Sequence, residues 1–413
     1  MNLTRRDFLG RTAAAGAVIA STSSVPHLLL RAAAAQPARS NDNVLVVVQL
    51  SGGNDGLNTV IPFADDVYNA NRFALRIGPD QVLKVDDYLG FHPSLRGFSE
   101  IYDNGLLGVV QGVGYPNPNR SHFESMDIWH TALQTGGARQ VGWIGRWLDS
   151  ERGGKLDTGA DVAAMHLGTD VQPLALGGLQ VHVPSIGSVE DFRMHGMEDA
   201  ALGDAIEAIV AAPRGETSDL RAFLQDAAQS ALAASRRIQA AAGRKATEVE
   251  YPTSGLAQRL SSVAQLIDVG LTTRVYYVTL DGFDTHSRQG DVHANLLREL
   301  GDAVGAFLKD LAVREQADRV LVMCFSEFGR RLKENGSQGT DHGAAAPMFV
   351  AGGQVRGGLI GEHPSLTDLV DGDVQHHTDF RQVYATVLEG WLGSPSEPLL
   401  AGEFARLPLV KQL

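Results

Sequence analysis

The stretch NVLVVVQLSGGNDG, residues 43–56, joins an apolar run to a polar, glycine-rich segment. A strand with one face in water alternates between apolar and polar residues. The run at 43–50 is apolar except for Asn43 and Gln49 and does not alternate, so it predicts a strand buried on both faces, as is typical of parallel sheets covered by helices. Such sheets bind ligands beyond the carboxyl ends of their strands, and the SGGNDG loop is therefore where a site is expected.

Four further segments have the same strand-like character, and helical segments separate them. In residues 291–311 and 380–392, apolar side chains recur every three or four positions, which indicates amphipathic helices. This alternation predicts an α/β fold with a doubly wound, mostly parallel sheet. The strand-like segments are LLGVVQGVGY at 106–115, RVYYVTLDGFDTH at 274–286, RVLVMCF at 319–325 and APMFVAGG at 346–353.

Residues 197–271 depart from this alternation. They are rich in alanine and other helix-forming residues, and they contain no strand-like run. We expect a helical insertion between the two halves of the sheet. Two roles stay open for it: a cap over a site, or a helical layer that contacts no site.

The first 35 residues have the features of an export signal. Residues 4–9, TRRDFL, match the twin-arginine pattern, a mildly apolar stretch follows, and four alanines at 32–35 suit signal-peptidase cleavage. A membrane anchor is disfavoured, because a spanning helix needs about 20 strongly apolar residues. We therefore predict a signal peptide at 1–35, export by the twin-arginine translocase without a stable membrane span, and a domain at 36–413 in the periplasm or outside the cell.

The charge of the chain limits its partners. The formal net charge is −13, and loss of residues 1–35 removes four arginines and one aspartate, which makes the remainder more negative. An acidic protein is repelled by nucleic acid and by anionic membrane surfaces, so neither is expected as a partner. The single cysteine, Cys324, lies inside an apolar run, which predicts a buried core residue and no disulfide.

Chemically capable side chains recur at the carboxyl ends of the predicted strands. Carboxylates and imidazoles from distant segments gather there, a mixture that a merely solvated loop does not need. Oxygen and imidazole ligands suit divalent ions, and Zn²⁺, Mn²⁺ and Ca²⁺ are the candidates. The residues are Asp55 after the first strand, Arg120 and Ser121 after the second, Asp281, Asp284 and His286 after the third, Glu327 and Arg330 after the fourth, and Asp341 and His342 before the fifth.

Several of these residues have a plainer interpretation. Asp284 could close a turn with its side chain and leave His286 exposed. The Asp341-His342 pair could be a turn or a helix cap, and Glu327 could be a solvated charge at a strand end. Metal binding accounts for all of them as one constellation.

Ser121 also has two possible roles. SHFE, residues 121–124, has the capping-box pattern, with serine as the N-cap and glutamate three residues later. A helix N-terminus also favours a developing negative charge, so a serine at this position beside a metal could act as a nucleophile. One hydroxyl group does not easily fill both roles.

Taken together, the motifs resemble a known bacterial family. QLSGGNDGLNTVIP, NRSHFESMDIWHTA, GWIGRWLD, LDGFDTH, SEFGR with NGSQGTDHG, and HTDFRQVYATVLEGWLG are similar to the exported family catalogued as domain of unknown function 1501. The likeness spans nearly the whole chain after the signal peptide. It implies a place in the alkaline phosphatase and sulfatase superfamily, and with it an α/β/α sandwich.

The resemblance also implies roles for individual residues. The superfamily's acidic metal ligand after the first strand corresponds most nearly to Asp55, and its nucleophilic serine or threonine at a helix start corresponds to Ser121. Its later strand-end pair of Asp and His, which binds one ion, is matched by Asp281 or Asp284 together with His286.

Phe328 departs from the superfamily pattern. The next strand of the superfamily ends in Asp-His, where this chain has Glu327 and Phe328. Phenylalanine cannot bind a metal, so a second ion site lacks one ligand unless Asp341 or His122 supplies it. The remaining three-ligand set is Asp284, His286 and His342.

The resemblance implies a metal-dependent hydrolase that cleaves phosphate or sulfate esters, either small molecules or envelope polymers. Ser121 would attack, and Arg120 or Arg330 would hold the anion. The alternative is a non-catalytic protein that binds or assembles the cell envelope on a degenerate form of the same fold. A twin-arginine-exported redox enzyme is a third, weaker hypothesis.

Overall fold

The structure is a computed structural model that describes residues 42–134, 140–152, 162–188 and 247–411. The predicted signal peptide at 1–35 lies outside these residues, as does most of the predicted insertion. From residue 43 onward, the described residues form one compact unit. Within the described part of the chain, no helix is both long enough and apolar enough to cross a membrane.

Nine strands of the described residues form the central sheet, in the order β13-β5-β12-β9-β1-β8-β6-β7, with β16 beside β5. All five strand-like segments of the sequence belong to it. The strands are β1 Val44–Ser51, β5 Leu107–Gly114, β6 Ala164–Leu167, β7 Ser185–Ile186, β8 Val275–Asp281, β9 Val320–Ser326, β12 Ala346–Ala351, β13 Gly358–Ile360 and β16 Thr378–Asp379.

The sheet is mostly parallel, as predicted. β1 pairs in parallel with both β8 and β9, and the register aligns Ser51 with Asp281 and Leu50 with Ser326. The ends of the three strands therefore meet at one edge, and the loops that follow them lie next to one another.

β12 runs antiparallel to both of its neighbours, β5 and β9. Between β9 and β12 the chain forms a two-stranded ribbon, β10 Arg330–Glu334 and β11 Thr340–His342, instead of a crossover helix. The connecting segment, residues 327–345, would be long enough for a crossover, but it stays as a ribbon at the edge where β9 ends. β12 therefore starts at that edge and runs opposite to β9.

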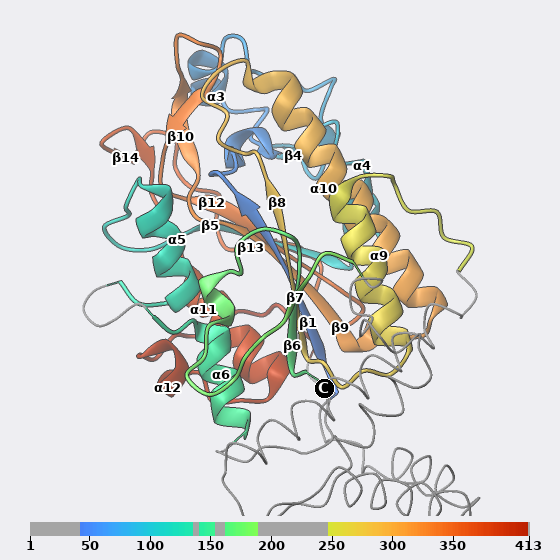
Figure 1. Cartoon of the computed structure of the whole chain (residues 1–413). Coiled ribbons are helices and arrows are strands. Elements are labelled where there is room, and N and C mark those ends of the chain that lie inside the picture. Colours follow the sequence, from blue (N-terminus) through green and yellow to red (C-terminus); the bar gives the residue numbers. More distant parts are fainter. Residues whose placement is uncertain (1–41, 135–139, 153–161, 189–246, 412–413) are drawn as a thin grey trace, which may run out of the picture. The chain divides into compact units, whose positions relative to one another are not determined.

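Helices cover both faces of the sheet (Figure 1), which confirms the doubly wound arrangement. Side chains of β1 alternate between the two cores: Val46 and Val48 pack with the helices of one face, and Leu45 and Val47 with those of the other. The helices are α4 Arg96–Asp103, α9 Gly255–Asp268 and α10 Gln289–Val313 on the first face, and α5 His122–Thr131, α6 Trp143–Arg152, α11 Phe380–Val387 with its π-helical continuation Leu388–Leu392, and α12 Glu397–Leu400 on the second.

The described end of the predicted insertion is α9. Its residues Leu256, Leu260 and Val263 are fully buried in the core that α10 shares. This helix is therefore a layer of the sandwich. The remainder of the insertion, residues 197–246, lies outside the described residues, and its role stays a prediction. Cys324 is buried and free, as expected.

Smaller elements complete the described chain. They surround the edge at which β1, β8 and β9 end, or connect the larger elements. They are η1 Gly56–Asn58, β2 Val60–Ile61, α3 Asp66–Asn71, β3 Leu83–Lys84, β4 Gly90–Phe91, η2 Leu174–Leu176, η4 Ala317–Arg319, β14 Leu369–Val370 and β15 Asp373–Val374.

The two glycines of the SGGNDG loop let it pass close to neighbouring loops. Gly52 and Gly53 have φ angles of +115° and +76°, which side-chain-bearing residues rarely adopt. A Cβ on Gly52 would lie 2.4 Å from the backbone nitrogen of Asp284. The glycine pair thus sets how closely the loops after β1 and β8 approach.

We expect Gly52→Ala to lower the free energy of unfolding by about 3 kcal/mol or more, because a strained φ and a steric clash add together. Gly105→Ala is the matched control: Gly105 has φ +70°, but a Cβ added to it would meet no heavy atom within 4 Å. It should cost only about 1 kcal/mol. Urea-induced unfolding measures both values, and equal losses would contradict the close approach.

Candidate metal centre

One carboxylate oxygen, Oδ1 of Asp284, is the meeting point of the candidate site. Nη2 of Arg330 lies 2.8 Å from it. Three imidazole Nε2 atoms surround it as well, at 3.0 Å for His286, 3.2 Å for His342 and 3.4 Å for His122. The structure thus joins four of the main candidate side chains with His122, which the sequence offered only as a possible replacement ligand.

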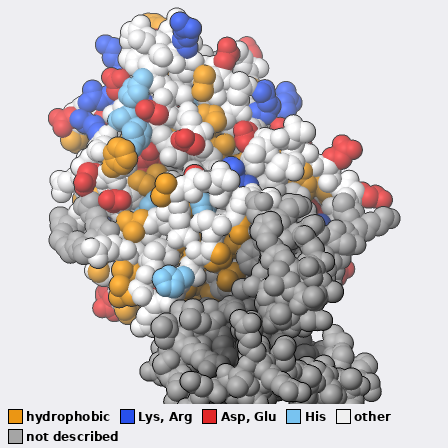
Figure 2. All heavy atoms as spheres, viewed as in Figure 1, with side chains coloured by type: hydrophobic (Ala, Val, Ile, Leu, Met, Phe, Trp, Pro, Cys, Tyr) orange, Lys and Arg blue, Asp and Glu red, His pale blue; other side chains and the backbone are white. Residues whose placement is uncertain are grey.

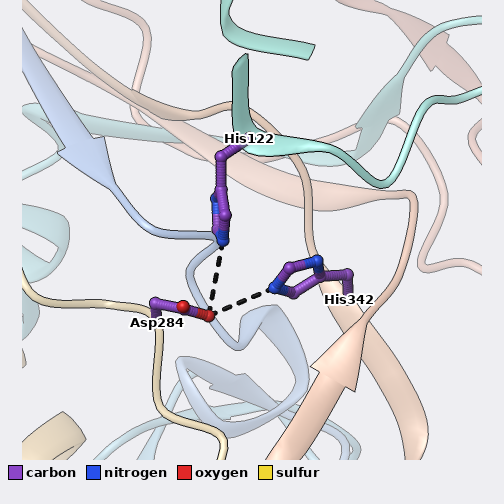
Figure 3. A group of neighbouring side chains, drawn as sticks. All are labelled: His122, Asp284 and His342. Carbon is purple, nitrogen blue, oxygen red and sulfur yellow. Dashed lines mark hydrogen bonds and ion pairs between the residues drawn. The ribbon is translucent and has the colours of Figure 1, made fainter. Parts of the chain in front are cut away.

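These side chains come from three separate parts of the chain (Figure 3). His122 is the first residue of α5, Asp284 lies in the loop after β8, and His342 ends β11. The β10–β11 ribbon pairs Arg330 with His342, which brings the imidazole next to the carboxylate that Arg330 contacts. In Figure 2 a group of histidine side chains lies at the surface among acidic and basic ones.

The spacing fits a divalent metal ion. Ligands about 2.0–2.1 Å from a tetrahedral Zn²⁺ lie roughly 3.3–3.4 Å from one another. His122, Asp284 and His342 each offer a ligand atom, and these three atoms lie within 4.8 Å of one another. His286 adds a fourth nitrogen, 2.9 Å from Nε2 of His342.

The tautomer of His342 supports a cation at this point. Its Nδ1 lies 2.8 Å from the carbonyl oxygen of Arg120, which can only accept, so the proton is on Nδ1. Burial lowers the pKa of His342 and favours the neutral ring. Its Nε2 lone pair then faces the carboxylate of Asp284 and also lies 2.9 Å from Nε2 of His286, so a cation among these three atoms would be attracted to the lone pair and to the carboxylate.

His122 is held by a buried carboxylate. Its Nδ1 lies 2.8 Å from Oε1 of Glu327, which also accepts the Gly52 N–H at 2.9 Å. Nε2 of His122 is buried and has no hydrogen-bond partner among the described residues. A carboxylate that orients a ligand imidazole in this way is common behind metal sites. Glu327 is therefore placed behind a candidate ligand.

The hydrogen bond that Nδ1–H of His122 donates to the carboxylate of Glu327 raises the pKa of His122. The pKa of Asp284 is lowered to about 2: burial alone would raise it, but the hydrogen bond from Arg330 and the positive charge of its guanidinium help to outweigh burial. Asp284 is therefore a carboxylate at any physiological pH, as a metal ligand must be.

Phe328, the residue that departs from the pattern implied by the sequence resemblance, packs against the site. Its ring centroid lies 4.9 Å from those of both His122 and His342, and the side chain is buried. It cannot bind a metal, but it supports two imidazoles that can.

The buried side chain of Arg330 links several loops by hydrogen bonds. It is 1% exposed and donates to the carbonyl oxygens of Gly52, Gly53, Phe283 and Thr340, as well as to Asp284. The guanidinium therefore binds backbone carbonyl groups, and its side chain has no exposed surface that a substrate anion could contact.

Asp55 takes part in a different buried network. Both of its oxygens bind the guanidinium of Arg72, at 2.5 and 3.0 Å, and Nε2 of Gln289 donates to it as well. Burial by itself would raise the pKa of Asp55, but Arg72 keeps it below the usual value. The carboxylate is thus paired with Arg72 and lies outside the cluster around Asp284.

The remaining candidates lie around the cluster. Ser121 is exposed and is the N-cap of α5, but its side chain makes no capping bond, so the capping box is not formed. Arg120 pairs with Asp373 at 2.5 Å. Asp281 is exposed at the end of β8, and Asp341 lies 3.5 Å from Nδ1 of His286.

A cleft of about 450 Å³ opens beside the cluster. His122, Asp284 and Glu327 line one part of it, and it continues over the ends of β1, β8 and β6. A space of this size accommodates a small molecule or one unit of a polymer. The candidate centre is therefore open to a substrate.

Sequence reasoning undervalues one of these residues. The motifs offer His122 only as a substitute for the ligand missing at Phe328. The signal that could have found it is its place immediately after Ser121, at the start of a helix that follows a strand. Which way its imidazole points depends on Glu327 and Phe328, and both are about 200 residues distant.

The chain belongs to the family described as protein of unknown function (DUF1501), whose model matches residues 109–406. This agrees with the resemblance seen in the sequence motifs. No curated protein matches the chain.

Several solved structures are similar to the chain at low identity. The C-terminal periplasmic domain of EcEptC from Escherichia coli, in complex with Zn, is 9% identical with a TM-score of 0.37, and the match covers 77% of this chain and 75% of that one. The PsFucS1 sulfatase from Pseudoalteromonas sp. is 11% identical with a TM-score of 0.37, covering 87% and 68%. A protein in the alkaline phosphatase superfamily from Vibrio parahaemolyticus is 8% identical with a TM-score of 0.33, covering 79% and 63%.

In the metal-free protein, we expect the imidazole of His122 to titrate above its ordinary pKa of 6.5, and Glu327→Gln to lower that pKa. A raised pKa means that the His122–Glu327 contact stabilises the fold fully below pH 6.5, and that this contribution is lost as the pH rises through the folded value. NMR titration of the imidazole Cε1–H resonance measures the pKa.

Glu403→Gln, which changes an exposed glutamate, is the control and should leave the titration unchanged. An unaltered pKa in Glu327→Gln would remove Glu327 as the cause.

Proposed function

We propose that this protein is an exported, metal-dependent hydrolase of phosphate or sulfate esters. The observation that carries the proposal is the convergence of three imidazole Nε2 atoms on Oδ1 of Asp284. The resemblance of the sequence motifs to the alkaline phosphatase and sulfatase superfamily supplies the ester class. Export rests on the twin-arginine pattern at 4–9.

His122, Asp284 and His342 would hold the metal, with His286 as a fourth ligand. The spacing favours Zn²⁺, and Mn²⁺ and Ca²⁺ remain alternatives. A bound divalent ion would polarise the ester oxygen and stabilise the negative charge that develops there. Glu327 would orient His122, and the Arg120 carbonyl would keep the proton of His342 on Nδ1.

Ser121 would be the nucleophile. It immediately precedes a metal ligand, its hydroxyl is exposed, and no capping bond occupies that hydroxyl. α5, ten residues long, begins beside it, so the positive end of a helix dipole would favour an anionic group there. The serine oxygen would bond to the phosphorus or sulfur atom while the ester bond breaks, and the alcohol would leave with the proton that the serine loses. Water would then attack the same atom, free the serine and release phosphate or sulfate.

We expect the folded protein to bind one equivalent of Zn²⁺, and Asp284→Asn or His342→Ala to weaken that binding by about tenfold to hundredfold or more, because each removes a ligand. His182→Ala removes an exposed histidine away from the cluster and should bind as the wild type does. Elemental analysis and competition titration measure the stoichiometry and affinity. Wild-type affinity in both ligand variants would exclude this metal centre.

Ser121→Ala should reduce kcat on chromogenic phosphate and sulfate esters by about 10³-fold or more, because covalent catalysis loses its nucleophile. Ser262→Ala on α9 is the control and should retain full activity. Full activity of Ser121→Ala would assign the attack to water. A wild-type protein inactive on every ester in the presence of Zn²⁺, Mn²⁺ or Ca²⁺ would favour the non-catalytic alternative.

A further inference from the structure

The cleft beside the candidate metal centre is acidic beyond the metal ligands. Asp127, Asp170 and Asp281 line it, and none of its described lining residues is a lysine or an arginine. A pocket built only for a phosphate or sulfate anion would be expected to present basic side chains. Apart from the metal region, the lining thus suits a positive charge.

Asp170 and Asp281 are available to a ligand. The nearest basic group to Asp170 among the described residues is Nε2 of His166, 3.6 Å from its Oδ1, which is longer than a hydrogen bond. Asp281 accepts a hydrogen bond from the N–H of Gly282 and is otherwise exposed. Neither carboxylate is neutralised by a described lysine or arginine.

A buried amide also lines the cleft. Gln49 is 6% exposed, and its Oε1 accepts from the hydroxyl of Tyr277 at 2.5 Å and lies 2.8 Å from Nε2 of His130. In the described part of the chain, nothing accepts a hydrogen bond from its NH₂ group. Such a group, more than nine-tenths buried on a cleft wall, is suited to bind an oxygen atom of a ligand.

The rim of the cleft is apolar. Phe123, in the first turn of α5, is 86% exposed, and Val171, in the loop after β6, is 91% exposed. Both line the cleft, and large apolar side chains this exposed commonly mark a binding surface. An aromatic ring beside carboxylates is also a favourable place for a quaternary or primary ammonium group.

We propose that the cleft selects zwitterionic esters, in which the alcohol part carries an ammonium group. The inference rests on the proposed hydrolase function and names its substrate class. The ester group would lie at the metal centre, and the cation would lie between Asp170 and Asp281, with its alkyl groups against Phe123. The negative net charge of the chain favours such a substrate over a simple dianion at long range.

Two phosphate monoesters of the same shape test the proposal: phosphocholine and 3,3-dimethylbutyl phosphate, in which carbon replaces the charged nitrogen. With Zn²⁺-loaded protein, we expect kcat/KM, measured by phosphate release, to be about tenfold higher for phosphocholine, since two carboxylates attract its positive charge and the aromatic ring of Phe123 adds a cation–π contact. Asp170→Asn should reduce this preference severalfold or more. Asp80→Asn, which changes an exposed aspartate that does not line the cleft, should retain it.

Binding separates this inference from the proposed function. If neither ester is hydrolysed, calorimetric titration of the two esters into the Zn²⁺-loaded protein decides the cation preference, whereas the failure of turnover counts against the hydrolase alone. Equal affinities for the two esters would overturn the inference, as would an unchanged preference in Asp170→Asn. A further outcome is that the protein binds a second equivalent of Zn²⁺, that Asp170→Asn abolishes this binding, and that the two esters bind with equal affinity. This outcome would overturn the inference in favour of a second metal site.

Discussion

The site depends on one buried charge, the guanidinium of Arg330. It ties the loop after β1 to the loop after β8 and to the β10–β11 ribbon, through carbonyl groups of all three and the carboxylate of Asp284. A buried guanidinium costs several kcal/mol in lost hydration, which is recovered only when its donors are satisfied. The three segments are therefore held together at the edge where the strands end.

The chemistry of the site follows from the different protonation states of its side chains. Asp284 remains a carboxylate, and His342 is held neutral with its lone pair directed at that carboxylate. His122 is stabilised in its charged form by Glu327. Metal binding would then displace a proton from His122, while Asp284 and His342 are already in the form that a metal ligand requires. Phe328 packs against both imidazoles and limits their movement.

Strong local patterns made much of the fold predictable. Five apolar runs identified five strands of the sheet, and three-to-four spacing identified α10 and α11. The direction of β12 could not be predicted, because it depends on a short ribbon in place of a helix, and the apolar run itself is the same for either direction. For the site, Asp284, His286 and His342 could be named from the sequence, but Asp55 could not be separated from them, since its pairing with Arg72 involves a residue that the motif does not contain.

By itself, the sequence determined the class of fold and the edge of the sheet at which chemistry is expected, because burial on both faces and strand-end position are local properties of the chain. Only the tertiary structure decided which polar residues at that edge work together. In the tertiary structure, Arg330 donates to backbone carbonyl groups and Asp55 pairs with Arg72. The hydroxyl of Ser121 makes no capping hydrogen bond, and His122 lies beside Asp284. The partners are 17 residues apart for Asp55 and Arg72 and 277 apart for Arg330 and Gly53, and no local pattern records which residues will meet.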